Sequence, residues 1–409
     1  MKMIPLAQVV QINPRPPRDL DDSQVISFLA MASISEDGEI THQVARRFGE
    51  VKKGFTFFQR GDVLLAKITP CFENGKSAFT EQLEHQIGFG STEFHVLRAR
   101  PERLNSRFLF HLVRSSRLRF LGKKSMKGAA GHKRVPADFL EKFEIPAWPL
   151  DDQRRIAHLL GKVEGMIAQR KEHLQQLDDL LKSVFLEMFG DPVRNEKGWV
   201  TYPLGSIGDV QGGLQVTPKR NNLELESPYL RVANVYRDKL DLREIKRIGL
   251  TPAELDRVRL QKGDLLIVEG HGNPEEVGRS AVWDGSIENC VHQNHLIRFR
   301  VDSSKITPLY ASFFINSSGG RQQMFRAGKT TSGLNTISSK NVKETIAVVP
   351  PLSLQNQFAA IAEKTEGIKS RYQQSLADLE ALYGALSQKA FKGELDLSRV
   401  PLSITGTVG

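Results

Sequence analysis

The sequence predicts an α+β protein in which two mixed α/β domains, each with a curled and mostly antiparallel sheet, alternate with two long helices. The first observation behind this prediction is a helical stretch that begins after Pro149 and ends at Gly190. The second is that this stretch returns later in the chain at a fixed offset. The third is that short strand and turn patterns precede each copy. The chain is therefore interpreted as an internal duplication.

The first helix carries a nearly continuous apolar seam. Apolar residues recur at alternating steps of four and three, a spacing typical of coiled coils, and Arg170 is the only interruption. Pro149 and Asp151 mark the start, because an Asp carboxylate accepts from the free N–H groups of a first turn. Gly190 and Pro192 mark the end. The predicted seam consists of Ile156, Leu160, Val163, Ile167, Leu174, Leu177, Leu181, Val184 and Met188.

A helix with such a seam needs a partner, and the same chain supplies one. Gln355 stands 202 positions after Gln153, and Glu164-Gly165 falls on Glu366-Gly367 at the same offset. The second helix is predicted from about Ser353 to Gly393. Its predicted seam consists of Phe358, Ile361, Ile368, Tyr372, Leu376, Leu379, Leu382, Tyr383 and Leu386.

The repeat extends upstream of both helices. Gly61-Asp62-Val63-Leu64-Leu65 resembles Gly263-Asp264-Leu265-Leu266-Ile267, and Gly131 falls on Gly333. Each copy is a domain with short strands, turns and a short helix, followed by a long helix. The predicted divisions are a first domain at 1–150, a central helix at 151–190, a second domain at 191–350, a C-terminal helix at 351–395 and a lightly packed tail at 396–409.

Composition narrows the class of protein. Of the 409 residues, 25% are charged, which is ordinary for a globular protein. The net charge of +10 favours a polyanionic partner. Cys71 and Cys290 have no metal-binding spacing and are expected to be free thiols in a reducing compartment. Neither a signal peptide nor an apolar run long enough to span a membrane is present. We therefore expect a cytoplasmic protein.

Basic residues concentrate at equivalent places in the two copies. Residues 98–134 contain twelve basic residues and one acid, and residues 305–343 contain six basic residues and no acid. Lys and Arg neutralise phosphates, whereas Thr, Asn and His can reach base edges. The alternative is a solvated basic face without a partner. The candidate DNA-binding residues of these two stretches are Lys123, Lys124, Lys127, His132, Lys133, Arg134, Arg326, Lys329, Thr330, Thr331 and Asn335.

The loops after the Gly-Asp strands are the second candidates. Their glycines would let the backbone approach a groove closely. They differ in residue type between the copies while the long helices match, as expected if one scaffold recognises two base sequences. The alternative is that they are plain hairpin turns. The candidates here are Lys67, Thr69, Asn74 and Lys76 in the first copy, and His271, Asn273 and Arg279 in the second.

Catalytic motifs were sought and none was found. Gly75-Lys76-Ser77 lacks the preceding glycine of a phosphate-binding loop, because Pro70 stands in its place. Asn13-Pro14-Arg15-Pro16 lacks the aromatic residue of an aminomethyltransferase motif. We therefore predict no catalytic residue and no metal ligand in this chain.

The chain resembles the specificity subunit of type I restriction-modification systems. The resemblance rests on the Gly-Asp strands, on the sequence Ile145 to Gln153 that leads into the first helix, and on its return as Val348 to Gln355. The duplicated order of domain, helix, domain and helix is its strongest part, and it covers nearly the whole chain.

This resemblance implies two target-recognition domains that each bind one half of a bipartite double-stranded DNA site. It implies that the two helices pack antiparallel as a spacer, in a pseudo-two-fold arrangement. The subunit would be non-catalytic. Two adenine-N6 methyltransferase subunits and ATP-dependent endonuclease-translocase subunits would bind it, and S-adenosylmethionine, ATP and Mg²⁺ would belong to those partners.

Two other classes of function stay open from the sequence. One is a coiled-coil adaptor whose basic domains bind nucleic acid or protein without recognising base sequence. The other is a nuclease or methyltransferase whose site is not visible in the sequence.

Overall fold

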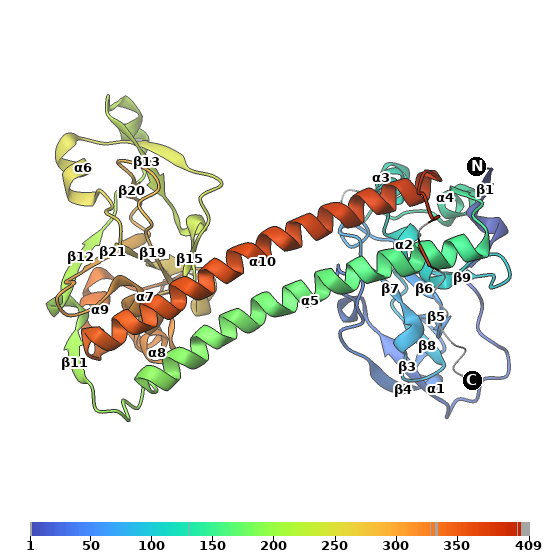
Figure 1. Ribbon diagram of the computed structural model, residues 1–409, viewed down its shortest axis with the longest axis horizontal. Helices are drawn as coiled ribbons and strands as arrows, with labels where there is room; N and C mark the ends of the chain where they lie inside the picture. Colours follow the sequence, from blue (N-terminus) through green and yellow to red (C-terminus); the bar gives the residue numbers. More distant parts are fainter. Residues whose placement is uncertain (1, 130, 328, 332–333, 399, 402–409) are drawn as a thin grey trace. The chain divides into compact units, whose positions relative to one another are not determined.

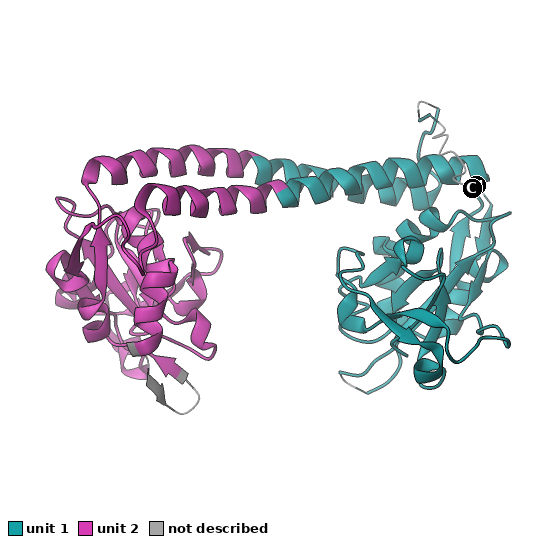
Figure 2. Ribbon diagram, turned by 90° about the horizontal axis from the view of Figure 1, so that it is seen from below, with its two compact units in different colours: residues 1–172, 372–409 teal, residues 173–371 magenta. Residues whose placement is uncertain are grey.

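The computed structural model describes residues 2–129, 131–327, 329–331, 334–398 and 400–401. It divides into two compact units (Figure 2): unit 1 holds residues 1–172 and 372–409, and unit 2 holds residues 173–371. Two long helices, α5 (Leu150–Phe189) and α10 (Leu352–Lys392), each contribute one half to each unit (Figure 1). The predicted bounds of both helices agree with these within a few residues.

Unit 1 is a mixed α/β unit with two four-stranded sheets. One sheet has the strand order β2-β9-β6-β7 and is antiparallel throughout, and the other has the order β4-β3-β8-β5 with a parallel β3–β8 pair. Strands β1 and β10 form a separate antiparallel pair. The strands are β1 (Met3–Pro5), β2 (Val10–Ile12), β3 (Val25–Leu29), β4 (Val44–Arg47), β5 (Thr56–Gln59), β6 (Val63–Ala66), β7 (Ser77–Phe79), β8 (Ile87–Gly90), β9 (Phe94–Ala99) and β10 (Glu144–Pro146), and the short helices are α1 (Phe48–Val51), α2 (Ser106–Val113), α3 (Ser116–Ser125) and α4 (Ala137–Lys142).

Unit 2 contains a sheet of the same strand order, β12-β21-β17-β19, again antiparallel. A second sheet, β16-β13-β20, has a parallel β13–β20 pair, and β18-β23-β22 forms a third. The strands are β11 (Val200–Pro203), β12 (Gly208–Gly212), β13 (Glu226–Leu230), β14 (Val235–Tyr236), β15 (Lys239–Leu240), β16 (Lys246–Gly249), β17 (Leu265–Val268), β18 (Gly270–His271), β19 (Ser280–Val282), β20 (Val291–His292), β21 (Leu296–Val301), β22 (Lys329–Thr331), β23 (Leu334–Thr336) and β24 (Ile346–Val349), and the short helices are α6 (Pro252–Val258), α7 (Pro308–Asn316), α8 (Ser318–Ala327) and α9 (Ser339–Glu344).

The long helices run antiparallel within each unit. In unit 1 the Trp148 indole N–H, just before α5, donates to the carbonyl oxygen of Ala390 near the end of α10 at 2.9 Å. In unit 2 Phe185 and Phe358 pack edge to face with ring centroids 5.6 Å apart. The halves of the helices therefore join the core of their own unit, where apolar burial is the main stabilising contribution.

The predicted seam holds for α5 and needs correction for α10. On α5, the buried seam residues are Ile156, Leu160, Val163 and Leu181, and the half-buried ones are Ile167, Leu174, Leu177 and Val184. Phe185 and Phe189 are buried and thus less exposed than Val184. On α10, Phe358 and Leu379 are buried and Tyr372 and Leu386 are half-buried, but Ile361, Ile368 and Leu382 are exposed.

The true inner stripe of α10 in unit 2 passes through small and polar residues. Ala362 and Thr365 are 3% and 4% exposed, and the Lys369 side chain is 17% exposed. These positions continue the four-three steps from Phe358 to Tyr372, and each predicted isoleucine lies one residue before a stripe position. A search for apolar residues selects the isoleucines because the actual seam residues there are not strongly apolar.

The segment after α10 is better packed than predicted. Leu397 is buried in the core of unit 1, with Leu395 and Val400 against the same core. Of the predicted tail, residues 399 and 402–409 lie outside the described residues. Among the residues that are described, no helix has both the length and the apolar character that a membrane span requires.

Candidate nucleic-acid interface

A buried ion pair starts the central strand of unit 1. Gly61, with a φ of +92°, forms the turn before β6, a conformation that favours glycine. The next residue, Asp62, is 1% exposed, and both of its carboxylate oxygens accept from Arg98 at 2.7 Å. Asp62 also accepts from the backbone N–H of Gln59 at 2.8 Å. The Gly-Asp motif therefore fixes where β6 begins.

The same contacts recur in unit 2, each 202 positions later. Gly263 has a φ of +93°, and Asp264 is 1% exposed. Arg300 donates to Asp264 at 2.7 and 2.8 Å, and Gln261 N–H donates to the same carboxylate at 2.7 Å. The two units thus hold their central strands by one set of interactions.

A buried glutamine ties the start of each long helix to its unit. Gln153 accepts from the N–H of Asn105 at 2.8 Å and donates to the carbonyl oxygens of Arg103 and Trp148. Gln355 makes the equivalent bonds to Thr307 at 2.7 Å, and to Lys305 and Pro350. These bonds explain why Gln is required at that place in both helix starts, since a buried amide needs partners.

In unit 1 the structure brings together the two loops that were predicted separately. Thr69 N–H donates to the carbonyl oxygen of Lys133 at 2.9 Å, and Val135 N–H donates to that of Lys67 at 2.9 Å. Ile68 and Arg134 form an isolated antiparallel bridge. The loop after β6 and the basic segment before α4 therefore form one surface.

In unit 2 the equivalent segments also pair. Strand β18 follows β17 closely and pairs with β23, with His271 opposite Asn335 and Gly270 opposite Thr336. Positions 270 and 336 correspond to 68 and 134 at the offset of 202. The surface built from paired loops is thus common to both units.

Several predicted residues of unit 1 already have partners. Arg134 forms a bidentate pair with Glu93 at 2.7 and 2.9 Å, and its guanidinium holds the pKa of the Glu93 carboxyl below its usual range. Asn74 donates to Glu36 at 2.7 Å, and Lys123 lies 3.3 Å from Glu73. Lys76 is half-buried, and its ammonium is 3.4 Å from the carbonyl oxygen of Met31.

Three of the predicted residues of unit 1 are exposed around the turn at 127–133. Lys127, His132 and Lys133 are exposed, and within the described residues no side-chain hydrogen bond or ion pair is recorded for them. Lys123 and Lys124 lie in the last turn of α3 and not in the predicted loop, and Lys124 rests 4.2 Å from the Phe120 ring centroid. Ammonium groups with this freedom suit phosphate contacts.

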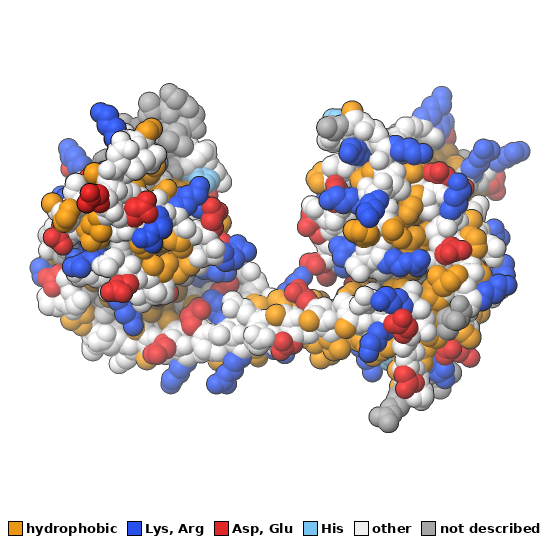
Figure 3. All heavy atoms as spheres, turned by 90° about the horizontal axis from the view of Figure 1, so that it is seen from above, with side chains coloured by type: hydrophobic (Ala, Val, Ile, Leu, Met, Phe, Trp, Pro, Cys, Tyr) orange, Lys and Arg blue, Asp and Glu red, His pale blue; other side chains and the backbone are white. Residues whose placement is uncertain are grey.

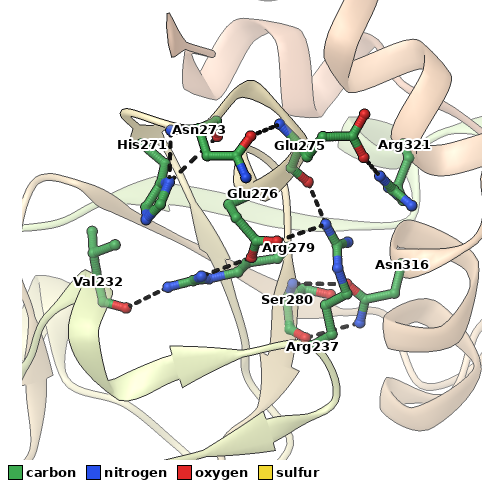
Figure 4. A network of polar contacts seen from close by, with 10 residues as sticks. All are labelled: Val232, Arg237, His271, Asn273, Glu275, Glu276, Arg279, Ser280, Asn316 and Arg321. Atoms are coloured by element: carbon green, nitrogen blue, oxygen red, sulfur yellow. Dashed lines mark hydrogen bonds and ion pairs between the residues drawn. The ribbon is translucent and has the colours of Figure 1, made fainter. Parts of the chain in front are cut away.

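In unit 2, the loop from His271 to Arg279 is held by a polar network (Figure 4). The backbone N–H of Asn273 donates to His271 Nδ1 at 3.0 Å, and the Asn273 side chain accepts from Glu275 N–H. Arg279 is 6% exposed, donates to Glu276 at 2.7 Å and reaches the carbonyl oxygen of Val232 at 3.1 Å. His271 and Asn273 remain accessible, whereas the placement of Arg279 inside this network does not suit a contact with DNA.

The remaining predicted residues lie around α8 and the β22–β23 pair. Arg326 is exposed in the last turn of α8, and Asn335 is half-buried in β23. Lys329, Thr330 and Thr331 form β22, but their side chains lie outside the described residues. Figure 3 shows Lys and Arg side chains over the visible face of each unit, interspersed with acidic and apolar ones.

Sequence reasoning missed Glu269. It is the first residue after β17, half-buried at the base of the surface that carries His271 and Asn335. The offset of 202 places it on Lys67, so aligning the two copies would have found it. A search for basic residues passes over a glutamate.

These features define a protein with two α/β units that share the same set of contacts and present paired loops. Residues 1–178 match the family model of the type I restriction modification DNA specificity domain. The resemblance to type I specificity subunits that the sequence predicted is confirmed by this match and by the relatives that follow.

Two relatives illustrate the likeness. The specificity subunit of the type I restriction enzyme EcoEI from Escherichia coli is 40% identical over 177 residues, which are 43% of this chain and 30% of that subunit. The EcoKI specificity subunit from Escherichia coli K12 is 29% identical over 343 residues, which are 78% of this chain and 72% of that one. The chain thus aligns with less than a third of the length of the first relative and with most of the second.

Solved structures support the fold. A chain from a structural study of assembly and conformational transition of a type I restriction-modification system superposes with a TM-score of 0.61 and 22% identity, covering 96% of this chain and 98% of that one. The specificity subunit from M. genitalium gives a TM-score of 0.53 and 13% identity, covering 95% and 96%. At these identities the likeness concerns the fold.

Proposed function

We propose that this chain is the non-catalytic DNA specificity subunit of a type I restriction-modification complex. Each unit recognises one half of a bipartite double-stranded DNA site, and the long helices set the distance between the halves. The chain also serves as the scaffold on which methyltransferase and endonuclease subunits assemble.

The observation that carries this proposal is one framework with two sets of side chains. The ion pair, the helix-start glutamine and the loop pairing recur at an offset of 202. On that framework, Thr69 in one unit corresponds to His271 in the other. Two units that recognise different base sequences can share one backbone framework but need different polar groups on it. Base edges are distinguished by their pattern of donors and acceptors.

The charge of the surface suits DNA. Exposed ammonium groups at Lys127 and Lys133 can contact phosphates, which supply affinity and orientation without sequence information. Neighbouring polar groups can then contact bases. They include the Thr69 hydroxyl in unit 1, which donates to Met126 Sδ at 3.7 Å and still has acceptor lone pairs, and the His271 imidazole in unit 2. The net charge of +10 favours the same kind of partner.

The helices are suited to act as a spacer. They contain 40 and 41 residues, and a helix of this length extends for about 60 Å. Two linked readers gain from a high effective concentration only when the connection matches the distance between their half-sites. A stiff connection therefore restricts binding to sites with one gap.

The outer sides of the helices supply a surface for partner subunits. Met166 and Leu180 on α5, and Ile368 and Leu382 on α10, are 42 to 50% exposed. Each residue of one pair stands 202 positions from its counterpart in the other. On each unit, these exposed apolar residues are accessible to partner subunits. We assign S-adenosylmethionine, ATP and Mg²⁺ to the partner subunits.

Methylation mapping tests the proposal. The chain is expressed with its methyltransferase subunit in a host that lacks DNA modification, and N6-methyladenine is located by sequencing. We expect a bipartite motif with a fixed gap, and replacing residues 1–150 by those of a relative should change one half only. Absence of methylation, with the methyltransferase shown to be bound, would support an adaptor without base recognition.

A further inference from the structure

Lys67 and Glu269 occupy equivalent places at the base of the two loop surfaces. Each is the first residue after its central strand, β6 in unit 1 and β17 in unit 2, and they stand 202 positions apart. One side chain is basic and the other is acidic. This exchange replaces a hydrogen-bond donor by an acceptor at equivalent places of the two surfaces.

Backbone hydrogen bonds show that the two residues are held alike. Lys67 N–H donates to the Glu93 carbonyl oxygen at 2.9 Å, and the Lys67 carbonyl oxygen accepts from Val135 N–H at 2.9 Å. Glu269 N–H donates to the His295 carbonyl oxygen at 2.9 Å, and its own carbonyl oxygen accepts from Ile337 N–H at 2.8 Å. Because equivalent backbone groups are bonded, the two side chains leave the backbone on the same side of their strands.

The surroundings place both side chains among the candidate DNA contacts. Lys67 lies next to the Glu93–Arg134 pair, and its charge acts on Glu93 and His95. Glu269 lies between β17 and β18, two residues before His271, and its N–H donates to the carbonyl oxygen of His295. In each unit the residue therefore borders the paired loops.

Within the described residues, no side-chain hydrogen bond or close ion pair explains either side chain. Both are half-buried. Burial alone raises the pKa of the Glu269 carboxyl. A desolvated carboxylate without a donor is unfavourable, so an external donor would be bound with a gain.

We propose that Glu269 is a specificity-determining residue that accepts a hydrogen bond from the exocyclic amino group of adenine or cytosine in the half-site of unit 2. Lys67, with donors only, takes the opposite role and binds the carbonyl oxygen or N7 acceptors of guanine in the half-site of unit 1. This inference rests on the proposed function, and it adds that the two half-sites differ in hydrogen-bonding sense at the matching base pair.

Exchange of the charge at position 269 tests the inference. Glu269→Lys and Glu269→Ala are each expressed with the methyltransferase subunit, and methylated sites are mapped. We expect Glu269→Lys to change the preferred base at one position in the half-site of unit 2 from adenine or cytosine to guanine. Glu269→Ala should lower the preference at that base pair about tenfold. The half-site of unit 1 should stay the same.

A conservative variant and a matched control separate recognition from folding. Glu269→Gln keeps an acceptor and adds a donor, so it should relax the preference without loss of methylation. Glu344→Lys makes the same charge change at the exposed end of α9 and should leave the motif unchanged.

The outcomes are distinguishable. If both Glu269→Lys and Glu269→Ala keep the wild-type half-site, the assignment of Glu269 is overturned while the proposed function stands. Loss of the whole unit 2 half-site in every variant, Glu269→Gln included, would show a folding role and also overturn it. Absence of a bipartite motif in the wild type would overturn the proposed function and this inference together.

Discussion

The guanidinium of Arg170 lies 4.2 Å from the centroid of the Tyr372 ring, and the two residues stand 202 positions apart in the repeat. Both belong to unit 1 and face each other from α5 and α10. Arg170 is thus not a defect in the apolar seam, because its equivalent on the other helix supplies an aromatic face for the cation. Polar groups in a seam also restrict which register two helices adopt.

This pair should be energetically coupled. In a double-mutant cycle with Arg170→Met and Tyr372→Leu, we expect a coupling energy of about 1 kcal/mol in the free energy of unfolding, measured by urea denaturation. The exposed pair Arg154–Asp151, 2.8 Å apart on α5, serves as the control and should couple more weakly. Equal coupling in the two cycles would mean that the cation and ring add nothing beyond a surface contact.

The ion pair under the central strand gives a second prediction. Asp62→Ala removes a buried carboxylate and leaves Arg98 and the Gln59 N–H without their partner, so unit 1 should lose about 3 kcal/mol of stability in urea. The double variant Asp62→Leu with Arg98→Met should lose less, because it leaves no unpaired charge.

Unit 2 supplies the matched comparison. Asp264→Ala breaks the equivalent pair with Arg300. Limited proteolysis should then cut first within residues 199–349, whereas Asp62→Ala should open residues 1–149. The same cleavage pattern in both variants would contradict the view that each unit holds its own framework.

A buried histidine makes stability depend on pH. His111 is 3% exposed, and its Nδ1 is 3.1 Å from the Tyr383 hydroxyl. Burial, followed by the nearby Arg114 charge, lowers the pKa of His111 to about 3. The folded state therefore stays neutral at His111 while the unfolded state takes up a proton below a pH of about 6.5.

The sign follows from proton binding. Because the unfolded chain binds more protons, the stability contributed by neutral His111 is complete above the unfolded pKa and is lost as pH falls toward 3. Between pH 7 and 5 the loss should be about 2 kcal/mol, and His111→Gln should flatten this part of the profile. His42→Gln, at an exposed position, should not change the slope. An unchanged slope in His111→Gln would show that other groups dominate.

Sequence patterns predicted the long helices well because their signals are local and repeated. The start at Pro149 and the stop at Gly190 are marked by residues next to them in the sequence. The offset of 202 is seen by comparing the two copies. The inner stripe of α10 could not be predicted in the same way. Ala362 is buried and Lys369 is half-buried because of the residues that pack against them, and a search for apolar residues does not detect this.

The sequence analysis named the loops of the candidate interface separately, but it did not predict that they pair with each other. The loops containing Thr69 and Lys133 are far apart in sequence, and only strand pairing brings them together. Arg279 resembled an exposed cation, yet Glu276 three residues earlier pairs with it inside the unit. Glu269 was passed over because its role depends on its equivalence to Lys67, and residue type alone does not reveal that equivalence.

The helical spacer leads to the last prediction, which rests on the proposed function. Leu177 is a half-buried seam residue in the C-terminal half of α5. Proline there removes a backbone donor and clashes with the preceding turn, at a cost of about 3 kcal/mol, so the helix should kink or break. Leu177→Ala keeps the helix and serves as the control.

Methylation mapping of these variants would show whether α5 sets the gap between half-sites. We expect Leu177→Pro to accept sites whose gaps are longer or shorter than in the wild type, with the bases of both half-sites unchanged. Leu177→Ala should keep one gap, because the connection remains a continuous helix. If Leu177→Pro methylates sites with the original gap only, the distance must be fixed elsewhere, either by α10 alone or by the partner subunits.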